Sequence, residues 1–302
     1  MKFKNSYSVN ISDLSDPDNQ ELMDRLDKIE LRLTDINTED HSTVVAAQEL
    51  ADQHNLEIET VHGTRISKLG EHPRGASDLM GKARNIELGY DNHGNRTKRL
   101  LSPSAIVYHP PYEDDSPDLS RDEMRENMVH NIAEFTESDL PPNADIALEN
   151  LPTPRGLIFD PRDIELVNDT AQDYGIGDEI AYTLDTVHTD EAVEMIQVMT
   201  NEDRLSNVHY SDHLAVDDPS IDFLKEKYPG EDEELLPWTE RPDTFTHLPP
   251  GEGDENFEAV IDELEEQGYQ GPLTMELHDR FKTLEGYELA VQTMKDSGYS
   301  ID

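Results

Sequence analysis

The chain has 302 residues, in which 68 Asp and Glu stand against 24 Lys and Arg, giving a formal charge of −44. Such acidity can indicate disorder, but the acidic residues are spread evenly and apolar runs recur throughout, so a folded protein is expected. An acidic, lysine-poor surface over a regular core is typical of a halophilic protein, such as one from a haloarchaeon, because molar salt screens the repulsion between the acids. The same charge disfavours a nucleic-acid partner, which requires a basic surface.

Cysteine is absent from the chain, which excludes disulfides, thiolate metal ligands and a cysteine nucleophile. The first residues, MKFKNSYSVNISDL, lack the apolar segment of a signal peptide. No apolar run approaches the ~18 residues that a membrane-spanning helix requires. These features predict a cytoplasmic protein with no membrane partner.

Strand-like and helix-like segments alternate along the chain. Short apolar runs predict strands at 2–11, 28–36, 56–64, 105–112, 144–152, 179–189, 206–213 and 271–279. Amphipathic segments predict helices at 16–26, 40–55, 120–138, 160–175, 189–200, 253–269 and 283–299, with Ser120 as the N-cap of the third. The pattern is unclear between 64 and 104, where 76–90 is assigned as helical and 90–98 as a turn or loop.

Eight strand–helix units predict an α/β fold, a (β/α)8 TIM barrel that forms one domain over residues 1–302. An open doubly wound sheet is the alternative, but NISDLSD, after the first strand, carries no glycine-rich phosphate loop. The interval between His209 and Glu276 is about twice the ~30 residues of one unit. It therefore predicts an insertion after strand 7, at about 214–246, that includes Trp238. A lid, a surface excursion and an oligomer contact are the three roles open to it.

Four strand ends carry side chains that bind metals. Glu149 lies in IALEN, Asp185 ends YTLD, His209 lies in NVHY and Glu276 ends LTME. In a barrel the C-terminal strand ends converge on one face, so we expect these residues to meet there. Three carboxylates and one imidazole favour one divalent ion, Mn²⁺ or Mg²⁺ ahead of Zn²⁺ or Co²⁺.

Residues 247–279, HLPPGEGDENFEAVIDELEEQGYQGPLTMELHD, strongly resemble the xylose isomerase-like barrel superfamily, which includes sugar isomerases and epimerases, hydroxypyruvate isomerases and endonuclease IV. The H-x-P-P-G-x-G run, followed by a helix and a strand ending in Glu, carries the resemblance. ALEN, D-x-x-H and V-H-x-x-D stand at the expected strands in the expected order. The resemblance implies the same four metal ligands, Glu149, Asp185, His209 and Glu276.

The resemblance also implies the roles of individual side chains. Glu149 and Glu276 would be the catalytic acid and base, and His188 would contact a substrate oxygen. The remaining candidates for substrate binding are His62, His109, His247 and, in the insertion, Trp238. Endonuclease IV uses positions that match His62, His109, His188 and His247 as further zinc ligands. However, Phe245 stands where that enzyme has an aspartate ligand, and phenylalanine binds no metal.

The expected function is therefore that of a divalent-metal-dependent isomerase or epimerase acting on a small sugar or polyol. Proton transfer next to a carbonyl would pass through an enediolate stabilised by the ion. An endonuclease IV-like phosphodiesterase with a multi-zinc site and a non-catalytic carbohydrate-binding barrel remain as alternatives. Relatives implied by the resemblance form dimers or tetramers, so a homo-oligomer also stays open.

Overall fold

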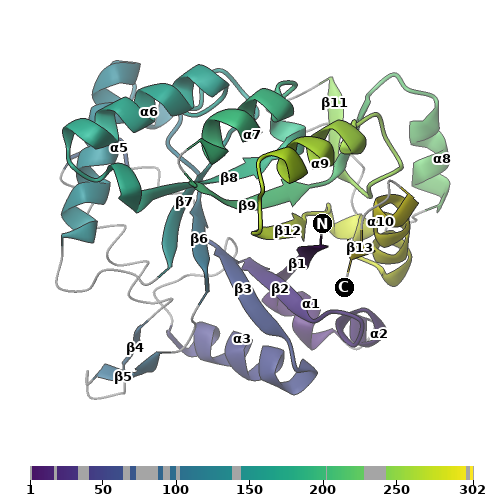
Figure 1. The fold of residues 1–302 in the computed structure, drawn as a ribbon. Coiled ribbons are helices and arrows are strands. Elements are labelled where there is room, and N and C mark those ends of the chain that lie inside the picture. The colour runs from purple at the N-terminus through teal and green to yellow at the C-terminus, as the bar shows by residue number, and fades with distance from the viewer. Residues whose placement is uncertain are drawn as a thin grey trace.

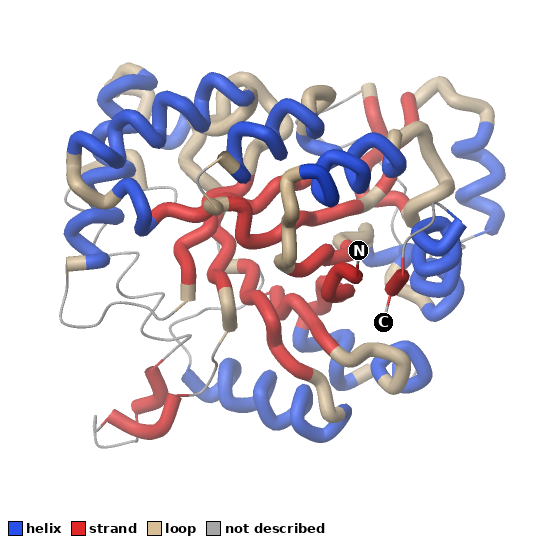
Figure 2. The backbone as a smooth tube through the Cα atoms, in the orientation of Figure 1, coloured by secondary structure: helices blue, strands red, loops and turns tan. Residues whose placement is uncertain are grey.

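A closed barrel of eight parallel strands forms the centre of the protein (Figures 1 and 2). The computed structural model describes residues 2–16, 19–32, 41–63, 69–72, 88–90, 96–99, 103–137, 144–201, 203–227, 243–296 and 300–301. The barrel strands are β1 (Lys2–Asn10), β2 (Lys28–Arg32), β3 (Glu57–His62), β6 (Ala105–Tyr108), β7 (Asp145–Glu149), β8 (Ile180–Asp185), β9 (Leu205–Tyr210) and β12 (Pro272–Met275). Neighbouring strands pair in parallel, and pairing of β12 with β1 closes the ring. The predicted (β/α)8 barrel is confirmed.

Helices lie outside this ring of strands, as Figure 2 shows in blue around red. They are α1 (Ile11–Ser15), α2 (Gln20–Met23), α3 (His41–His54), α5 (Arg121–Thr136), α6 (Pro161–Asp173), α7 (Ala192–Thr200), α9 (Phe257–Glu266) and α10 (Leu284–Asp296). The predicted cap of α5 is confirmed, because Ser120 Oγ accepts a hydrogen bond from the amide of Glu123. Asp160 caps α6 in the same way. Among the described residues, no helix is long and apolar enough to cross a membrane.

Successive side chains of each barrel strand point to opposite faces, so the strands separate two buried regions. Outward-facing side chains such as Val9, Leu31, Leu148 and Val208 belong to the main hydrophobic core, between strands and helices. Inside the barrel, a small apolar cluster is formed by Ala105, Val107, Ala147 and Ala181. Many of the other inward positions are polar and buried: Ser6, Ser8, Glu30, Thr60, His62, Glu149, Thr183, Asp185, Asn207, His209, Thr274 and Glu276. The barrel interior is therefore a polar core that leads to the C-terminal strand ends.

The remaining elements lie outside the eight-strand ring. The strands β4 (Leu88–Tyr90) and β5 (Arg96–Arg99) form an antiparallel hairpin. The helix predicted for 76–90 is wrong at Leu88–Tyr90, where backbone pairing forms a strand; its other residues lie outside the described ones. The turn or loop predicted for 90–98 is wrong at Tyr90, which ends β4, and at 96–98, which lie in β5. The strand β13 (Ser300–Ile301) pairs with β1.

The predicted insertion follows β9, the seventh barrel strand. It starts at β10 (Asp212–Ala215), continues in α8 (Ser220–Lys227) and returns in β11 (Thr244–Leu248), which pairs antiparallel with β10. Trp238 lies outside the described residues, so its predicted contact with substrate stays a prediction. Phe245 is buried in the hydrophobic core.

Candidate metal centre

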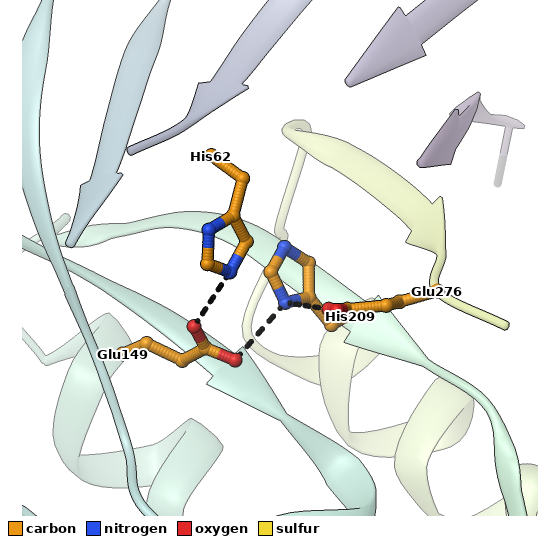
Figure 3. Close-up of side chains that lie close together, drawn as sticks. All are labelled: His62, Glu149, His209 and Glu276. Atoms are coloured by element: carbon orange, nitrogen blue, oxygen red, sulfur yellow. Dashed lines mark hydrogen bonds and ion pairs between the residues drawn. The ribbon is translucent and has the colours of Figure 1, made fainter. Parts of the chain in front are cut away.

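One group of four buried side chains meets at the C-terminal strand ends. His62 ends β3, Glu149 ends β7, His209 lies in β9 and Glu276 directly follows β12. Figure 3 shows their heads pointing toward one another. Nδ1 of His209 lies 3.2 Å from a carboxylate oxygen of Glu149 and 2.8 Å from one of Glu276. Nε2 of His62 lies 3.1 Å from the other oxygen of Glu149. Two carboxylates therefore converge on one imidazole nitrogen.

A second group lies beside the first and consists of Asp185, His188 and His247. Asp185 ends β8, and His188 closes the one-turn 3-10 helix (Thr186–His188) that follows it. Nε2 of His188 lies 3.3 Å from Oδ2 of Asp185. His247, in β11, has a backbone φ of 57°, which a non-glycine residue adopts at some cost. The potential ligand atoms of this group lie within 4.8 Å of one another.

Hydrogen bonds fix the tautomer of His188. Its Nδ1–H donates to the carbonyl oxygen of Asn150 at 2.8 Å, while the Asn150 side chain holds the backbone of Asp185. Nε2 of the neutral ring therefore keeps its lone pair and faces the carboxylate of Asp185. This arrangement suits a nitrogen that binds a cation or accepts a hydrogen bond from a substrate hydroxyl.

Charge balance shifts the pKa values in the first group. Burial opposes ionisation of Glu149, but the histidines at 109 and 209 hold the pKa of its carboxyl well below its usual range. Burial likewise opposes ionisation of Glu276, and Arg32 with His209 lowers that pKa well below normal. Burial disfavours the charged ring of His209, yet the surrounding carboxylates raise its pKa well above the usual value. Without a metal, a proton on His209 thus offsets part of the negative charge of these carboxylates.

Desolvation dominates in the second group. Burial raises the pKa of Asp185 to about 7, and the nearby negative charge of Glu149 adds to the shift. Burial lowers the pKa of His188 to about 4. Burial also lowers the pKa of His247. A bound cation would reverse the cost of ionising Asp185 and would keep these imidazoles neutral.

The donor set fits a divalent ion on a further ground. Oδ2 of Asp185 is buried but accepts no hydrogen bond from the described residues, whereas Oε2 of Glu276 faces Nδ1 of His209 at 2.8 Å. Unsatisfied carboxylate oxygens are costly inside a protein, and a metal ion is a partner that removes this cost. Mixed carboxylate and imidazole ligands suit Mn²⁺, Zn²⁺ and Co²⁺. The two groups together offer seven residues with ligand atoms.

Two more side chains flank these groups at the strand ends. Arg32, the last residue of β2, forms an ion pair with Glu276 at 2.6 Å. His109, directly after β6, places Nε2 2.9 Å from Glu149. Both side chains are about one-quarter exposed, whereas Glu149 and Glu276 are buried. Arg32 and His109 therefore reach solvent, unlike the two glutamates that they contact.

The structure therefore divides the nine site residues predicted from the sequence. His62, Glu149, His209 and Glu276 lie in the first group, and Asp185, His188 and His247 in the second. His109 contacts the first group. Of the four predicted ligands, three therefore lie in the first group and Asp185 lies in the second. The fourth member of the first group is His62, which contacts Glu149. Trp238 is the ninth residue.

Sequence reasoning missed two charged residues of β2, Glu30 and Arg32. Glu30 is fully buried and lies 3.0 Å from Nε2 of His209. Asp212, two residues after β9, accepts hydrogen bonds from the amides of Gly251, Gly253 and Glu255. It fixes the loop before α9, where a Cβ on Gly253 would come within 2.3 Å of a carbonyl oxygen.

Comparisons with known proteins agree with this architecture. The chain belongs to the xylose isomerase-like TIM barrel family, whose sequence profile matches residues 21–297. A search of curated proteins gave no significant match. The structure of a D-tagatose 3-epimerase-like protein is similar, with a TM-score of 0.65, 20% identity and coverage of 98% of this chain and 97% of that one.

Two further solved structures share the fold. A D-psicose 3-epimerase in the presence of D-fructose has a TM-score of 0.61 and 14% identity, with 98% of each chain covered. The IOLI protein with a bound zinc atom has a TM-score of 0.57 and 18% identity, covering 98% of this chain and 96% of that one. At such low sequence identity, the structural similarity establishes a shared fold and no more.

The lowered pKa of His188 predicts how the metal-free protein responds to acid. A histidine in the unfolded chain takes up a proton near its ordinary pKa of 6.5, whereas the folded His188 does so only near 4. Its contribution to stability is therefore present above pH 6.5 and is lost as the pH falls toward 4. Between pH 7 and pH 4.5 the loss should reach about 2–3 kcal/mol.

Denaturant unfolding in constant molar KCl measures this effect. Metal-free wild type and His188→Gln are compared at pH 7 and at pH 4.5. The wild type should lose more free energy of unfolding than the variant by the amount above. Parallel losses in the two proteins would contradict a neutral, buried His188.

Proposed function

We propose that the protein is a divalent-metal-dependent isomerase or epimerase of a small sugar or polyol. The observation that carries the proposal is the convergence of Glu149 and Glu276 on Nδ1 of His209, at 3.2 Å and 2.8 Å. Two carboxylates around one centre supply both an acid and a base for moving a proton next to a carbonyl. Similar folds in a D-tagatose 3-epimerase-like protein and a D-psicose 3-epimerase support the substrate class.

Glu149, Asp185, His209 and Glu276 would hold the ion, with His62 beside them. The ion, when bound, would polarise two neighbouring oxygens of the substrate and so acidify the carbon-bound proton between them. One glutamate would remove that proton, and the same glutamate or the other would return it to carbon. Return to the neighbouring carbon gives aldose–ketose isomerisation, and return on the opposite face gives epimerisation.

The other residues at the strand ends would bind and orient the substrate. Nε2 of His188, with its lone pair, would accept a hydrogen bond from a hydroxyl group. His109 and Arg32 would donate hydrogen bonds to substrate oxygens from the solvent side. Arg32 also keeps Glu276 ionised in the metal-free state, since its charge lowers that pKa. A base that is ionised before the substrate arrives is ready to accept a proton.

Metal analysis tests the ligand assignment. The wild-type protein, purified in molar KCl and equilibrated with Mn²⁺, Zn²⁺ or Co²⁺, should retain about one ion per chain. His209→Ala removes the nitrogen at the centre of the first group and should lower metal content to a small fraction of this value. His54→Ala is a matched control, because His54 lies at the end of α3, bonded to the carbonyl of Leu14. Equal metal in wild type and His209→Ala would refute the assignment.

A multi-metal phosphodiesterase resembling endonuclease IV is the second candidate function. The observation favouring it is the group of Asp185, His188 and His247 beside the first group, which would hold a second ion. Two or three ions per chain and nicking of abasic DNA would favour this function. The burial of Phe245 in the hydrophobic core and the charge of −44 speak against it.

A further inference from the structure

Glu30 lies in the middle of β2, and the residues directly before and after it in the strand are apolar. In β2, the side chains of Ile29 and Leu31 belong to the outer hydrophobic core, so Glu30 faces the barrel interior. Its exposed fraction is 0%. An ionised carboxylate at such a position costs several kcal/mol unless hydrogen bonds replace its water. The contacts of Glu30 therefore indicate why the chain retains a glutamate here.

Four side chains from three other strands surround the carboxylate. Oε1 accepts a hydrogen bond from Ser8 Oγ at 3.2 Å, in β1. Oε2 accepts hydrogen bonds from Thr60 Oγ1, in β3, and from Asn207 Nδ2, in β9, both at 3.0 Å. The fourth contact joins Oε2 to Nε2 of His209 at 3.0 Å. Asn207 is itself fixed, because its Oδ1 accepts from Thr274 Oγ1 at 2.9 Å.

We propose that Glu30 is a positioning residue whose negative charge directs Nδ1 of His209 to the metal and strengthens this nitrogen as a ligand. This inference rests on the proposed function, since it requires a metal at the first group. When Nε2–H donates to Glu30, only Nδ1 keeps a lone pair, and Nδ1 is the nitrogen near Glu149 and Glu276. The carboxylate also makes the ring a stronger ligand through its charge. Residues on β1, β3 and β9 thus fix the orientation of one ligand.

A purely structural role is the competing interpretation, in which Glu30 only ties the polar side chains inside the barrel together. The two roles differ in what the loss of charge would do. A structural tie needs hydrogen bonds, and an amide supplies them. A positioning carboxylate needs its negative charge as well, because that charge strengthens the ligand. A substitution that keeps the hydrogen bonds and removes the charge separates them.

Glu30→Gln is that substitution. The amide oxygen can accept from Thr60, Asn207 and His209, and the Ser8 hydroxyl can rotate to accept from the new amide NH₂. Glu59→Gln is the matched control, because Glu59 is also a buried glutamate, lies on β3 and pairs with Lys28. It stands three residues before His62, roughly 10 Å along the strand.

Co²⁺ titration in molar KCl provides two measurements, the dissociation constant and the visible absorption bands of the bound ion. Loss of the group that hydrogen-bonds the other ring nitrogen of a metal-binding histidine typically weakens metal affinity about 10–100-fold. We therefore expect Glu30→Gln to bind Co²⁺ about 10–100-fold more weakly and to shift the absorption bands. Glu59→Gln should match the wild type in both, and all three metal-free proteins should share the same far-ultraviolet circular dichroism.

The outcomes separate this inference from the proposed function. Wild-type affinity and bands in Glu30→Gln would overturn the positioning role and leave the function standing. A wild type that binds no Co²⁺, Mn²⁺ or Zn²⁺ would overturn both. If Glu30→Gln does not fold, Thr60→Val removes one of the four contacts while keeping the shape. That variant should show a smaller loss of affinity in the same direction, and unchanged affinity would overturn the positioning role.

Discussion

Replacing Glu149 or Glu276 with glutamine is expected to lower kcat about 10²–10⁴-fold, the usual contribution of a general acid or base. Glutamine keeps the shape and one acceptor oxygen of the carboxylate but cannot take up a proton. The loss should therefore appear mainly in kcat, as for a group needed in the transition state. Because both residues also lie among the proposed ligands, metal content must be measured in each variant.

Deuterium exchange gives a readout that does not depend on finding the preferred product. Metal-loaded wild type incubated in D₂O with ketohexoses such as D-tagatose or D-fructose should place deuterium on a carbon next to the carbonyl. The glutamine variants, loaded with the same metal, should place little or none there. Asp212→Asn serves as a comparison variant, because Asp212 holds the loop before α9 and touches neither group in the described contacts.

Three results would count against the proton-transfer mechanism. Interconversion of sugars without any exchange would indicate a hydride shift instead. Full activity in metal-loaded Glu149→Gln and Glu276→Gln would remove the assigned acid and base. A loaded wild type that leaves every sugar unchanged but nicks abasic DNA would favour the phosphodiesterase.

Much of the fold was predictable because strand ends and helix caps are local signals. The capping side chain of Ser120 and the apolar runs in β7, β8 and β9 locate their elements within a few residues. The hairpin of β4 and β5 was missed because its pairing joins separate segments, and the segment 88–90 contains no alternation that distinguishes strand from helix. The short strand β13 is defined only by its pairing with β1.

The candidate site, like the fold, was predictable from the sequence only in part. Glu149, His209 and Glu276 were found because each ends an apolar run, which the barrel brings to one face. The grouping of Asp185 with His188 and His247 depends on side-chain directions and could not be predicted from spacing. Glu30 carried a usable signal, a charge between Ile29 and Leu31 in a strand. Its partners, Ser8 and Asn207, are far away in the sequence, so its role became visible only in the closed barrel.

The stability of the protein is expected to rise steeply with salt. The 24 Lys and Arg residues are too few to balance the 68 Asp and Glu residues, which leaves the charge of −44. Acidic side chains recur on the exposed helix faces. On α9, Glu258, Asp262 and Glu266 are exposed at successive four-residue intervals. Like charges at this spacing destabilise a helix by about 0.2–0.5 kcal/mol per pair. Screening shortens the Debye length from about 10 Å at 0.1 M to about 3 Å at 1 M salt, which weakens all such pairs together.

Melting temperatures of the metal-free protein in KCl, from 0.1 M to 3 M, measure this effect. We expect a rise on the order of 10 °C, which corresponds to several kcal/mol, because each kcal/mol shifts the melting temperature of a protein of 150–250 residues by about 2–4 °C and that of a longer chain by less. A sorbitol series of equal osmolality is the control, since sorbitol adds no charge to screen the acids. Asp262→Lys should raise the melting temperature in dilute salt and gain less from added KCl, because it replaces two repulsive pairs on α9 by attractive ones. A flat KCl series would contradict the halophilic interpretation, and equal responses to KCl and sorbitol would show that charge screening is not its cause.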